Sequence, residues 1–208
     1  MRWNWIRNND RVAVVGTTGS GKSTLLRVAL VPIRPYAALY DPKGEWEGKE
    51  WLTVREAARL PKNPHPRVRY YPYPEELADK EALDTFFRWV YLRQNTILVV
   101  DEAYLATMGG RWLPPFYQAC LAQGRGLGIG VISATQRPYY IPQSILTEAE
   151  HWFIFKLRAP QDVHAVAQWT GIEHRKIKTL EKHEWYYVGD NGFSGPHVLG
   201  LTCDIMHM

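Results

Sequence analysis

The sequence predicts an α/β protein: a mainly parallel β-sheet with helices on both faces and an antiparallel hairpin at its C-terminal end. Two observations support this fold class. Short apolar runs, typical of buried strands, alternate along the chain with patterns typical of helices. Several of these runs end in polar or acidic residues, as expected where the carboxyl ends of parallel strands form a ligand-binding edge. Because 208 residues is an ordinary size for one domain, we expect 1–208 to be a single domain.

Strands are expected in the first half of the chain where a short apolar run is bounded by turn residues. A weak alternation also suggests an edge strand at 3–7. Prolines mark the helices: Pro32 and Pro35 end the first, and Pro74 suits the first turn of the longest. The expected order is strand 11–15, helix 22–31, strand 36–40, helix 53–60, strand 67–71, helix 75–93 and strand 96–102.

The second half of the chain continues the alternation and then ends in two neighbouring strands. The turn at 189–192 contains two glycines and joins these strands, which predicts the antiparallel hairpin. The expected order is loop 104–113, helix 114–123, strand 128–136, strand 151–157, helices 160–169 and 173–181, and strands 184–189 and 197–202.

Composition limits the classes of protein and partner. The formal net charge is +4 and the pI about 9.0, which is compatible with a polyanionic partner but equally with a mildly basic surface. No run of 18 apolar residues exists, so we expect no membrane span. Cys120 and Cys203 form neither a metal-binding spacing nor a disulfide framework, so a reducing compartment is the simplest expectation.

The segment that organises the chain runs from Gly16 to Ser23 and matches the phosphate-binding pattern G-x-x-x-x-G-K-[ST]. An apolar strand precedes it and a helix follows it, which is the context that this Walker A motif requires. Its glycines let backbone N–H groups turn toward an anion, and Lys22 can reach the β- and γ-phosphates. We therefore expect ATP with Mg²⁺, contacted by Gly16, Thr17, Thr18, Gly19, Ser20, Gly21, Lys22, Ser23 and Thr24.

Two acids end the buried strand at 96–102 and resemble a Walker B motif. Asp101 is expected to hold Mg²⁺ through water, together with the hydroxyl of Ser23. Glu102 is expected to polarise the water that attacks the γ-phosphate. The alternative for both acids is that they cap the element that follows.

Polar residues near the next strand complete the predicted catalytic set. Gln136 ends that strand, where its amide could sense the γ-phosphate, or where it could simply be satisfied by the backbone. Arg125 lies between glycines just before the strand. It could stabilise the transition state at a neighbouring subunit's nucleotide, or be a solvated loop residue. Arg158 is a second candidate for this role.

Four stretches together resemble the HerA/FtsK group of P-loop DNA-translocating ATPases, with a RecA/ASCE-like sheet. They are 16–23, Asp41-Pro-Lys-Gly-Glu45, Val99-Val-Asp-Glu-Ala103 and the glycine-rich run 124–138, which ends in Ala-Thr-Gln-Arg-Pro. The resemblance covers about residues 11 to 190. It implies a homo-oligomeric ring, a hexamer or pentamer, around double-stranded DNA. It also implies nucleotide between subunits, with an arginine supplied by the neighbour.

The chain differs from the cellular members of this group in its size. Only ten residues precede the first motor strand, and neither a membrane anchor nor a winged-helix module is recognised. This is similar to the minimal genome-packaging ATPases of tailless, membrane-containing icosahedral viruses. That likeness implies a DNA translocase that fills a preformed capsid, in contact with capsid vertex or portal proteins. It further implies a location in the host cytoplasm or at a capsid vertex of the virion.

DNA contacts are expected on loops, because a translocase holds phosphates without reading sequence. The candidates are Arg111, Lys43 and Lys49, each of which could instead be an ordinary surface residue.

Three other functions remain open at this stage. One is a phage assembly or extrusion ATPase of the zonula-occludens-toxin type, although such chains usually carry a membrane segment. Another is a nucleotide-binding switch subunit without turnover, which would not need Glu102. The third is a small-molecule kinase, for which the acids and the Thr-Gln-Arg-Pro run are less typical.

Overall fold

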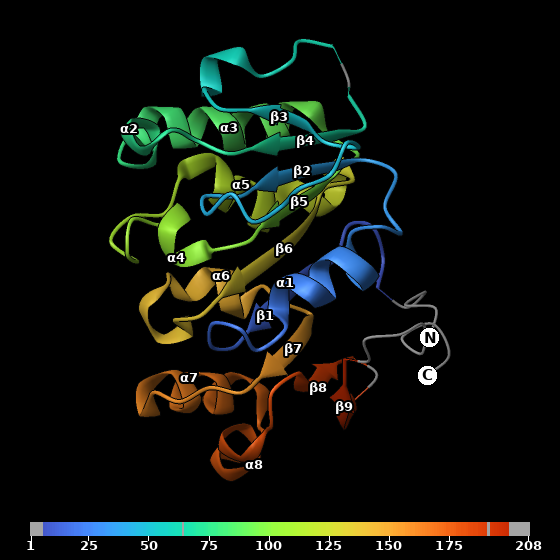
Figure 1. Ribbon diagram of the computed structural model, residues 1–208, viewed down its shortest axis with the longest axis vertical. Helices are drawn as coiled ribbons and strands as arrows, with labels where there is room; N and C mark the ends of the chain where they lie inside the picture. Colours follow the sequence, from blue (N-terminus) through green and yellow to red (C-terminus); the bar gives the residue numbers. More distant parts are fainter. Residues whose placement is uncertain (1–5, 64, 191, 200–208) are drawn as a thin grey trace.

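The computed structural model describes residues 6–63, 65–190 and 192–199. In this part of the chain nine strands form one sheet in the order β3-β4-β2-β5-β6-β1-β7-β8-β9 (Figure 1). Neighbours from β3 to β7 are parallel, and β8 and β9 add antiparallel strands, so the predicted fold class is confirmed. The strands are β1 Arg11–Val15, β2 Ala37–Tyr40, β3 Leu52–Val54, β4 Arg67–Tyr70, β5 Ile97–Val100, β6 Gly130–Thr135, β7 His151–Phe155, β8 Glu184–Gly189 and β9 Gly192–Val198.

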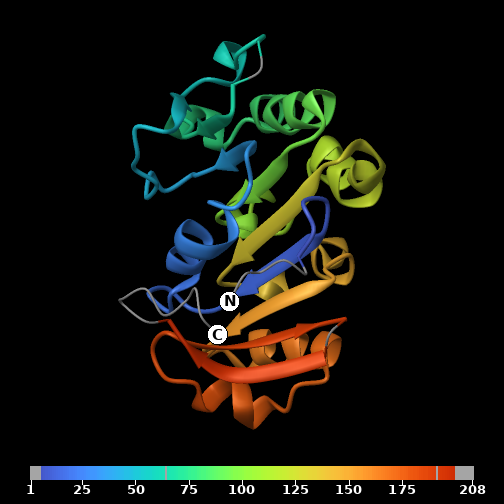
Figure 2. The same cartoon turned by 90° about the vertical axis from the view of Figure 1, so that its right-hand side faces the viewer.

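Helices cover the two faces of the sheet unequally, as Figure 2 shows. One face carries α1 and its π-helical continuation, and buried residues of the segment after β2, Trp46 and Trp51, share that core. The other face carries the longer helices. The helices are α1 Lys22–Leu25 with the π-helical turn Leu26–Leu30, α2 Pro74–Leu77, α3 Lys80–Arg93, α4 Ala103–Ala106, α5 Pro115–Gln123, α6 Gln143–Thr147, α7 Pro160–Thr170 and α8 His174–Thr179.

Strand register brings the polar strand ends together. Val15 at the end of β1 pairs with Thr135 of β6 on one side and with Ile154 of β7 on the other. Val100 at the end of β5 pairs with Ser133 of β6. Since all these strands are parallel, the segments that follow them meet at one edge, which is the binding edge of such a sheet.

Two predicted helices differ from the structure. The expected helix at 53–60 begins instead as strand β3, whose aliphatic and β-branched residues pair with β4, and only Ala57–Arg59 form a 3₁₀ turn. The expected helix at 75–93 is two helices, α2 and α3. Asp79 separates them, because its side chain accepts hydrogen bonds from the N–H groups of Glu81 and Ala82 and so begins a new helix.

Smaller differences concern element ends. The expected loop 104–113 overlaps the short helix α4, and α6 was not expected. The last strand begins earlier than expected, at Gly192, and residues 200–202 of the expected strand lie outside the described residues, as does Cys203. Residues 3–5 of the expected edge strand are also outside them, and Ile6 and Arg7 are not in a strand. No helix of the described residues combines the length and apolar character needed to span a membrane.

Candidate nucleotide site

The phosphate loop folds as the motif predicts. Gly19 and Gly21 adopt positive φ values of 71° and 114°, which side chains other than glycine rarely tolerate. At Gly21 a Cβ atom would also lie 2.6 Å from Cδ1 of Leu199. Gly21 occupies the N-cap position of α1, and no side chain among the described residues caps this helix. The first N–H groups of the helix are therefore available to an anion.

Lys22 is held inside the loop. Its Nζ donates hydrogen bonds to the carbonyl oxygens of Gly16 and Thr17, at 2.8 and 3.0 Å. The side chain is buried, and burial lowers the pKa of Lys22 to about 8, although nearby Glu102 counteracts this shift. A bound phosphate would supply the counter-charge that this lysine lacks.

Asp101 lies beside the phosphate loop, next to Ser23. The hydroxyl of Ser23 donates to the two carboxylate oxygens of Asp101, at 3.3 and 3.4 Å. The indole N–H of Trp46 donates to the same carboxylate at 2.5 Å. Burial raises the pKa of Asp101 to about 6, and the bond from Trp46 works against this rise. Ser23 and Asp101 thus present hard oxygen ligands side by side.

Glu102 is almost fully buried and points toward the end of β6. It occupies the N-cap position of α4, but its side chain makes no capping bond. Its Oε1 instead accepts hydrogen bonds from the hydroxyl of Thr135 at 3.2 Å and from the backbone N–H of Gln136 at 3.4 Å. Its Oε2 pairs with Nζ of Lys43 at 2.8 Å. The capping alternative for Glu102 is therefore wrong.

Gln136 contacts the phosphate loop directly. Its side-chain oxygen accepts a hydrogen bond from the hydroxyl of Thr18 at 2.5 Å. Together with the bond from its backbone N–H to Glu102, this contact places Gln136 between the phosphate loop and Glu102.

The segment after β2 is shaped by Asp41, which is completely buried. Its carboxylate accepts hydrogen bonds from the backbone N–H groups of Glu45 and Trp46 and forms an ion pair with Arg69 at 2.7 Å. These bonds fold the segment back over the sheet edge. As a result one loop reaches both acids, through Lys43 to Glu102 and through Trp46 to Asp101.

A cavity of about 440 Å³ lies over the phosphate loop, within the range of small-molecule sites. Its lining includes Lys182 and His183, from the connection between α8 and β8, which no motif in the sequence marks. Trp46 was likewise not expected at the site, because no motif marks it. The lining residues are Thr18, Gly19, Gly21, Lys22, Ser23, Thr24, Arg27, Lys43, Glu45, Asp101, Gln136, Lys182 and His183.

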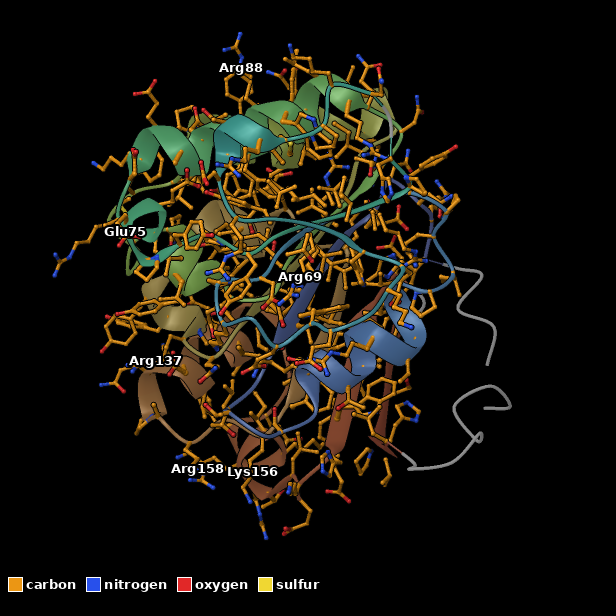
Figure 3. All side chains as sticks on the ribbon, turned by 45° about the horizontal axis from the view of Figure 1, so that its top comes forward. Arg69, Glu75, Arg88, Arg137, Lys156 and Arg158 are labelled. Carbon is orange, nitrogen blue, oxygen red and sulfur yellow. The ribbon has the colours of Figure 1, made fainter. Side chains whose placement is uncertain are left out.

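The two candidate arginines lie at opposite ends of the parallel strands: Arg125 at the amino ends and Arg158 at the carboxyl ends. Arg125 precedes β6, at the end of the strand away from the phosphate loop, and pairs with Glu150 and more distantly with Asp10. It cannot reach the nucleotide site of its own subunit. Arg158 follows β7 at the same edge as the phosphate loop and points outward near Lys156 (Figure 3).

The candidate DNA contacts are placed differently from one another. Arg111 and Lys49 are exposed. Lys43 lies on the segment between β2 and β3, where it also lines the cavity and pairs with Glu102. Contact of Lys43 with DNA stays a prediction.

The site and fold can be compared with known proteins. No protein-family model matches the sequence. The DNA packaging ATPase P9 of Enterobacteria phage PRD1 is 25% identical over 211 residues, covering 88% of this chain and 85% of P9. The genome packaging NTPase B204 of Sulfolobus turreted icosahedral virus 2, solved with AMPPCP, is 21% identical with a TM-score of 0.77, covering 93% of this chain and 100% of B204.

A more distant structure shares the same architecture. VirB4 of Thermoanaerobacter pseudethanolicus is 11% identical with a TM-score of 0.68, covering 92% of this chain and 90% of VirB4. These comparisons confirm the resemblance expected from the motifs. The chain is a homologue of the packaging ATPase P9 and has the P-loop NTPase fold of B204.

Proposed function

We propose that this chain is an ATPase that uses hydrolysis to move double-stranded DNA into a viral capsid. One observation carries the proposal: Lys22 and Asp101, from two distant parts of the chain, line one cavity, and Glu102 is ion-paired with Lys43 of the same cavity wall. Similarity to P9, a DNA packaging ATPase, supports the DNA part of the proposal. B204 has been solved with AMPPCP and with ATP-gammaS, which supports ATP as the nucleotide.

The geometry suggests how the residues divide the reaction. Lys22 and the N–H groups of the phosphate loop hold the β- and γ-phosphates and stabilise the charge that develops there. Glu102 orients the attacking water and accepts its proton as the bond from the γ-phosphorus to ADP breaks. A positioned base of this kind contributes roughly 10²–10⁴-fold to the rate. Gln136, between the loop and Glu102, responds to the γ-phosphate.

Ser23 and Asp101 suit Mg²⁺, because a hydroxyl and a carboxylate 3.3 Å apart leave the remaining positions to phosphate and water. Bound Mg²⁺ would neutralise charge on the β- and γ-phosphate oxygens.

The assembly is part of the proposal. The single motor domain 1–208 would form a ring, a hexamer or pentamer, in which Arg125 or Arg158 reaches the neighbour's nucleotide. Arg111 and Lys49 would contact DNA phosphates in that ring, and capsid vertex or portal proteins would hold it. The motor would act in the host cytoplasm and stay docked at a vertex of the virion.

ATP hydrolysis with and without double-stranded DNA, at low and moderate salt, tests this function. We expect DNA to stimulate turnover and salt to reduce the stimulation, because phosphate contacts release counterions. The Glu102→Gln variant should bind ATP without hydrolysing it. Turnover that ignores DNA at every salt concentration would contradict DNA transport. Binding without any turnover would favour a nucleotide-binding switch.

A further inference from the structure

The nucleotide cavity has two chemically different ends. Asp101, Lys43 and Gln136 lie at one end, on the side of β5 and β6. Lys182 and His183 lie at the other end, on the connection that leads into β8. Figure 1 shows this division, because β5 and β6 lie on one side of β1, and β7 and β8 on the other.

The connection that carries His183 is fixed to the phosphate loop. The N–H of His183 donates to the carbonyl oxygen of Ser20 at 3.2 Å, and its own carbonyl accepts from the N–H of Leu199 at 3.0 Å. His183 has a positive φ of 68°, uncommon for a residue other than glycine. These backbone bonds hold the residue in place beside the loop.

The imidazole of His183 lies over Gly21. A Cβ atom built on Gly21 would be 3.0 Å from Nδ1 of this ring, which shows how closely the histidine approaches the start of α1. The side chain is half-buried and lines the cavity, so one part of it remains accessible to a ligand. Lys182 beside it is exposed and adds a flexible cation.

The direction of a bound nucleotide follows from these positions. The γ-phosphate belongs at the end with Asp101 and Gln136, and the other phosphates lie over the N–H groups of the loop and the start of α1. The ribose and base must then leave the loop toward β8. There they meet Lys182 and His183.

We propose that Lys182 and His183 form the nucleoside subsite of this cavity. The ring of His183 packs against the base, and Lys182 covers the ribose with its aliphatic stem and donates to the sugar oxygens. This inference rests on the proposed use of a nucleoside triphosphate. It adds that binding is driven partly by the nucleoside and not by the phosphates alone.

Calorimetric titration with two probes tests the subsite: AMPPCP, which has a nucleoside, and inorganic tripolyphosphate, which has none. His183→Asn is the informative variant, because asparagine tolerates the positive φ that alanine does not. We expect it to weaken AMPPCP about tenfold, as loss of a ring stacked on a base does, and to leave tripolyphosphate within twofold. His174→Asn, an exposed histidine of α8 that does not line the cavity, should change neither.

Lys182→Met should likewise weaken AMPPCP by more than it weakens tripolyphosphate. Equal weakening of both probes by His183→Asn, or of neither, would overturn the subsite. The wild-type protein separates the two proposals. If it binds AMPPCP no more tightly than tripolyphosphate, the subsite is wrong while the phosphate site stands. If it binds neither probe, the proposed ATPase function itself fails.

Discussion

Nζ of Lys43 lies 2.8 Å from Oε2 of Glu102, so the proposed catalytic base is ion-paired with a lysine of the cavity wall. Glu102 is 5% exposed and Lys43 33% exposed, which makes the pair only partly desolvated. Water screens such a pair in part, yet removing the lysine leaves a carboxylate buried without its counter-charge.

A double-mutant cycle measures this pair. Lys43→Met should lower the free energy of unfolding by about 1 kcal/mol at pH 7.5, and the loss should be smaller in a Glu102→Gln background, where no charge is stranded. Denaturant titration of the four proteins gives the coupling. Additive effects of the two substitutions would show that the pair contributes nothing to the folded state.

Trp46 is expected to keep Asp101 ionised. Trp46→Phe removes the indole N–H bond to Asp101 and retains an aromatic ring. Because that bond lowers a pKa that burial raises to about 6, the acid limb of kcat/KM for ATP should move up by roughly one pH unit. Trp51→Phe is the control. Trp51 packs edge-on against Trp46, and within the described part of the chain it forms no hydrogen bond with Asp101. Equal acid limbs in wild type and Trp46→Phe would refute this role.

The lowered pKa of Lys22 predicts that the affinity for AMPPCP depends on pH. Its pKa is lowered from 10.5 to about 8, so the free protein loses this proton as the pH rises through 8, whereas bound phosphate favours the charged form. AMPPCP should therefore bind about tenfold more weakly at pH 9 than at pH 7. In Lys22→Arg the guanidinium stays charged, and the ratio of the two affinities should be close to one. A wild-type affinity that is equal at both pH values would contradict the shift.

The same lowered pKa affects stability with a definite sign. Between about pH 8 and 10.5 the unfolded chain holds the lysine proton more often than the folded protein does. The contribution of Lys22 to the free energy of unfolding therefore rises with pH across this window and is least favourable below it. Lys22→Met should remove this rise, which unfolding curves at pH 7 and 9.5 would detect.

Gly110 lies in the loop that carries Arg111, and its backbone packs against Tyr140 in the segment after Gln136. Its φ is 80°, and a Cβ atom there would lie 1.5 Å from the carbonyl oxygen of Tyr140. Gly110→Ala should displace the loop and abolish stimulation of ATPase activity by DNA, while AMPPCP affinity stays near the wild-type value.

Gly109→Ala is the matched control for that substitution. Gly109 also has a positive φ, 76°, but a Cβ atom there meets only the Tyr104 side chain, no closer than 3.4 Å. It should cost about 1 kcal/mol of stability and retain most of the DNA stimulation. If DNA stimulates the ATPase activity of both variants equally, the contact between Gly110 and Tyr140 has no part in coupling DNA binding to ATP hydrolysis.

In the proposed ring, Arg125 is expected to act at the nucleotide of the neighbouring subunit. It lies at the sheet edge away from the phosphate loop, so Arg125→Ala should leave AMPPCP affinity unchanged and reduce hydrolysis by roughly 10³-fold or more. Mixing Arg125→Ala with Glu102→Gln subunits should restore part of the activity, because some interfaces then hold both functional residues. Arg158→Ala is the comparison, and a larger loss there would assign the role to Arg158.

The sequence is sufficient to predict secondary-structure elements where these depend on local patterns. Strand β1 and the helix beginning at Lys22 match their predicted positions because the apolar run and the glycine motif act within a few residues. Strand β3 was missed because three residues carry no periodic signal, and the pairing partner β4 decides their conformation. The break at Asp79 was missed because a capping side chain interrupts an otherwise continuous helical pattern.

The candidate site shows the same limit. Lys22, Asp101, Glu102 and Gln136 could be proposed as neighbours from the sequence because each follows the end of a strand, and parallel strands bring such ends together. The ion pair of Lys43 and the bond from Trp46 depend on how Asp41 folds the loop after β2. His183 depends on a connection far along the chain that packs on the phosphate loop. No pattern near these residues predicts such contacts.

Displacement of a third strand from a triplex at the end of linear double-stranded DNA tests the central claim, ATP-driven DNA movement, most directly. We expect the wild-type protein to displace the strand with ATP and Mg²⁺, and to fail with AMPPCP or with the Glu102→Gln substitution. Hydrolysis of ATP at a normal DNA-stimulated rate without displacement of the third strand would contradict a translocating motor.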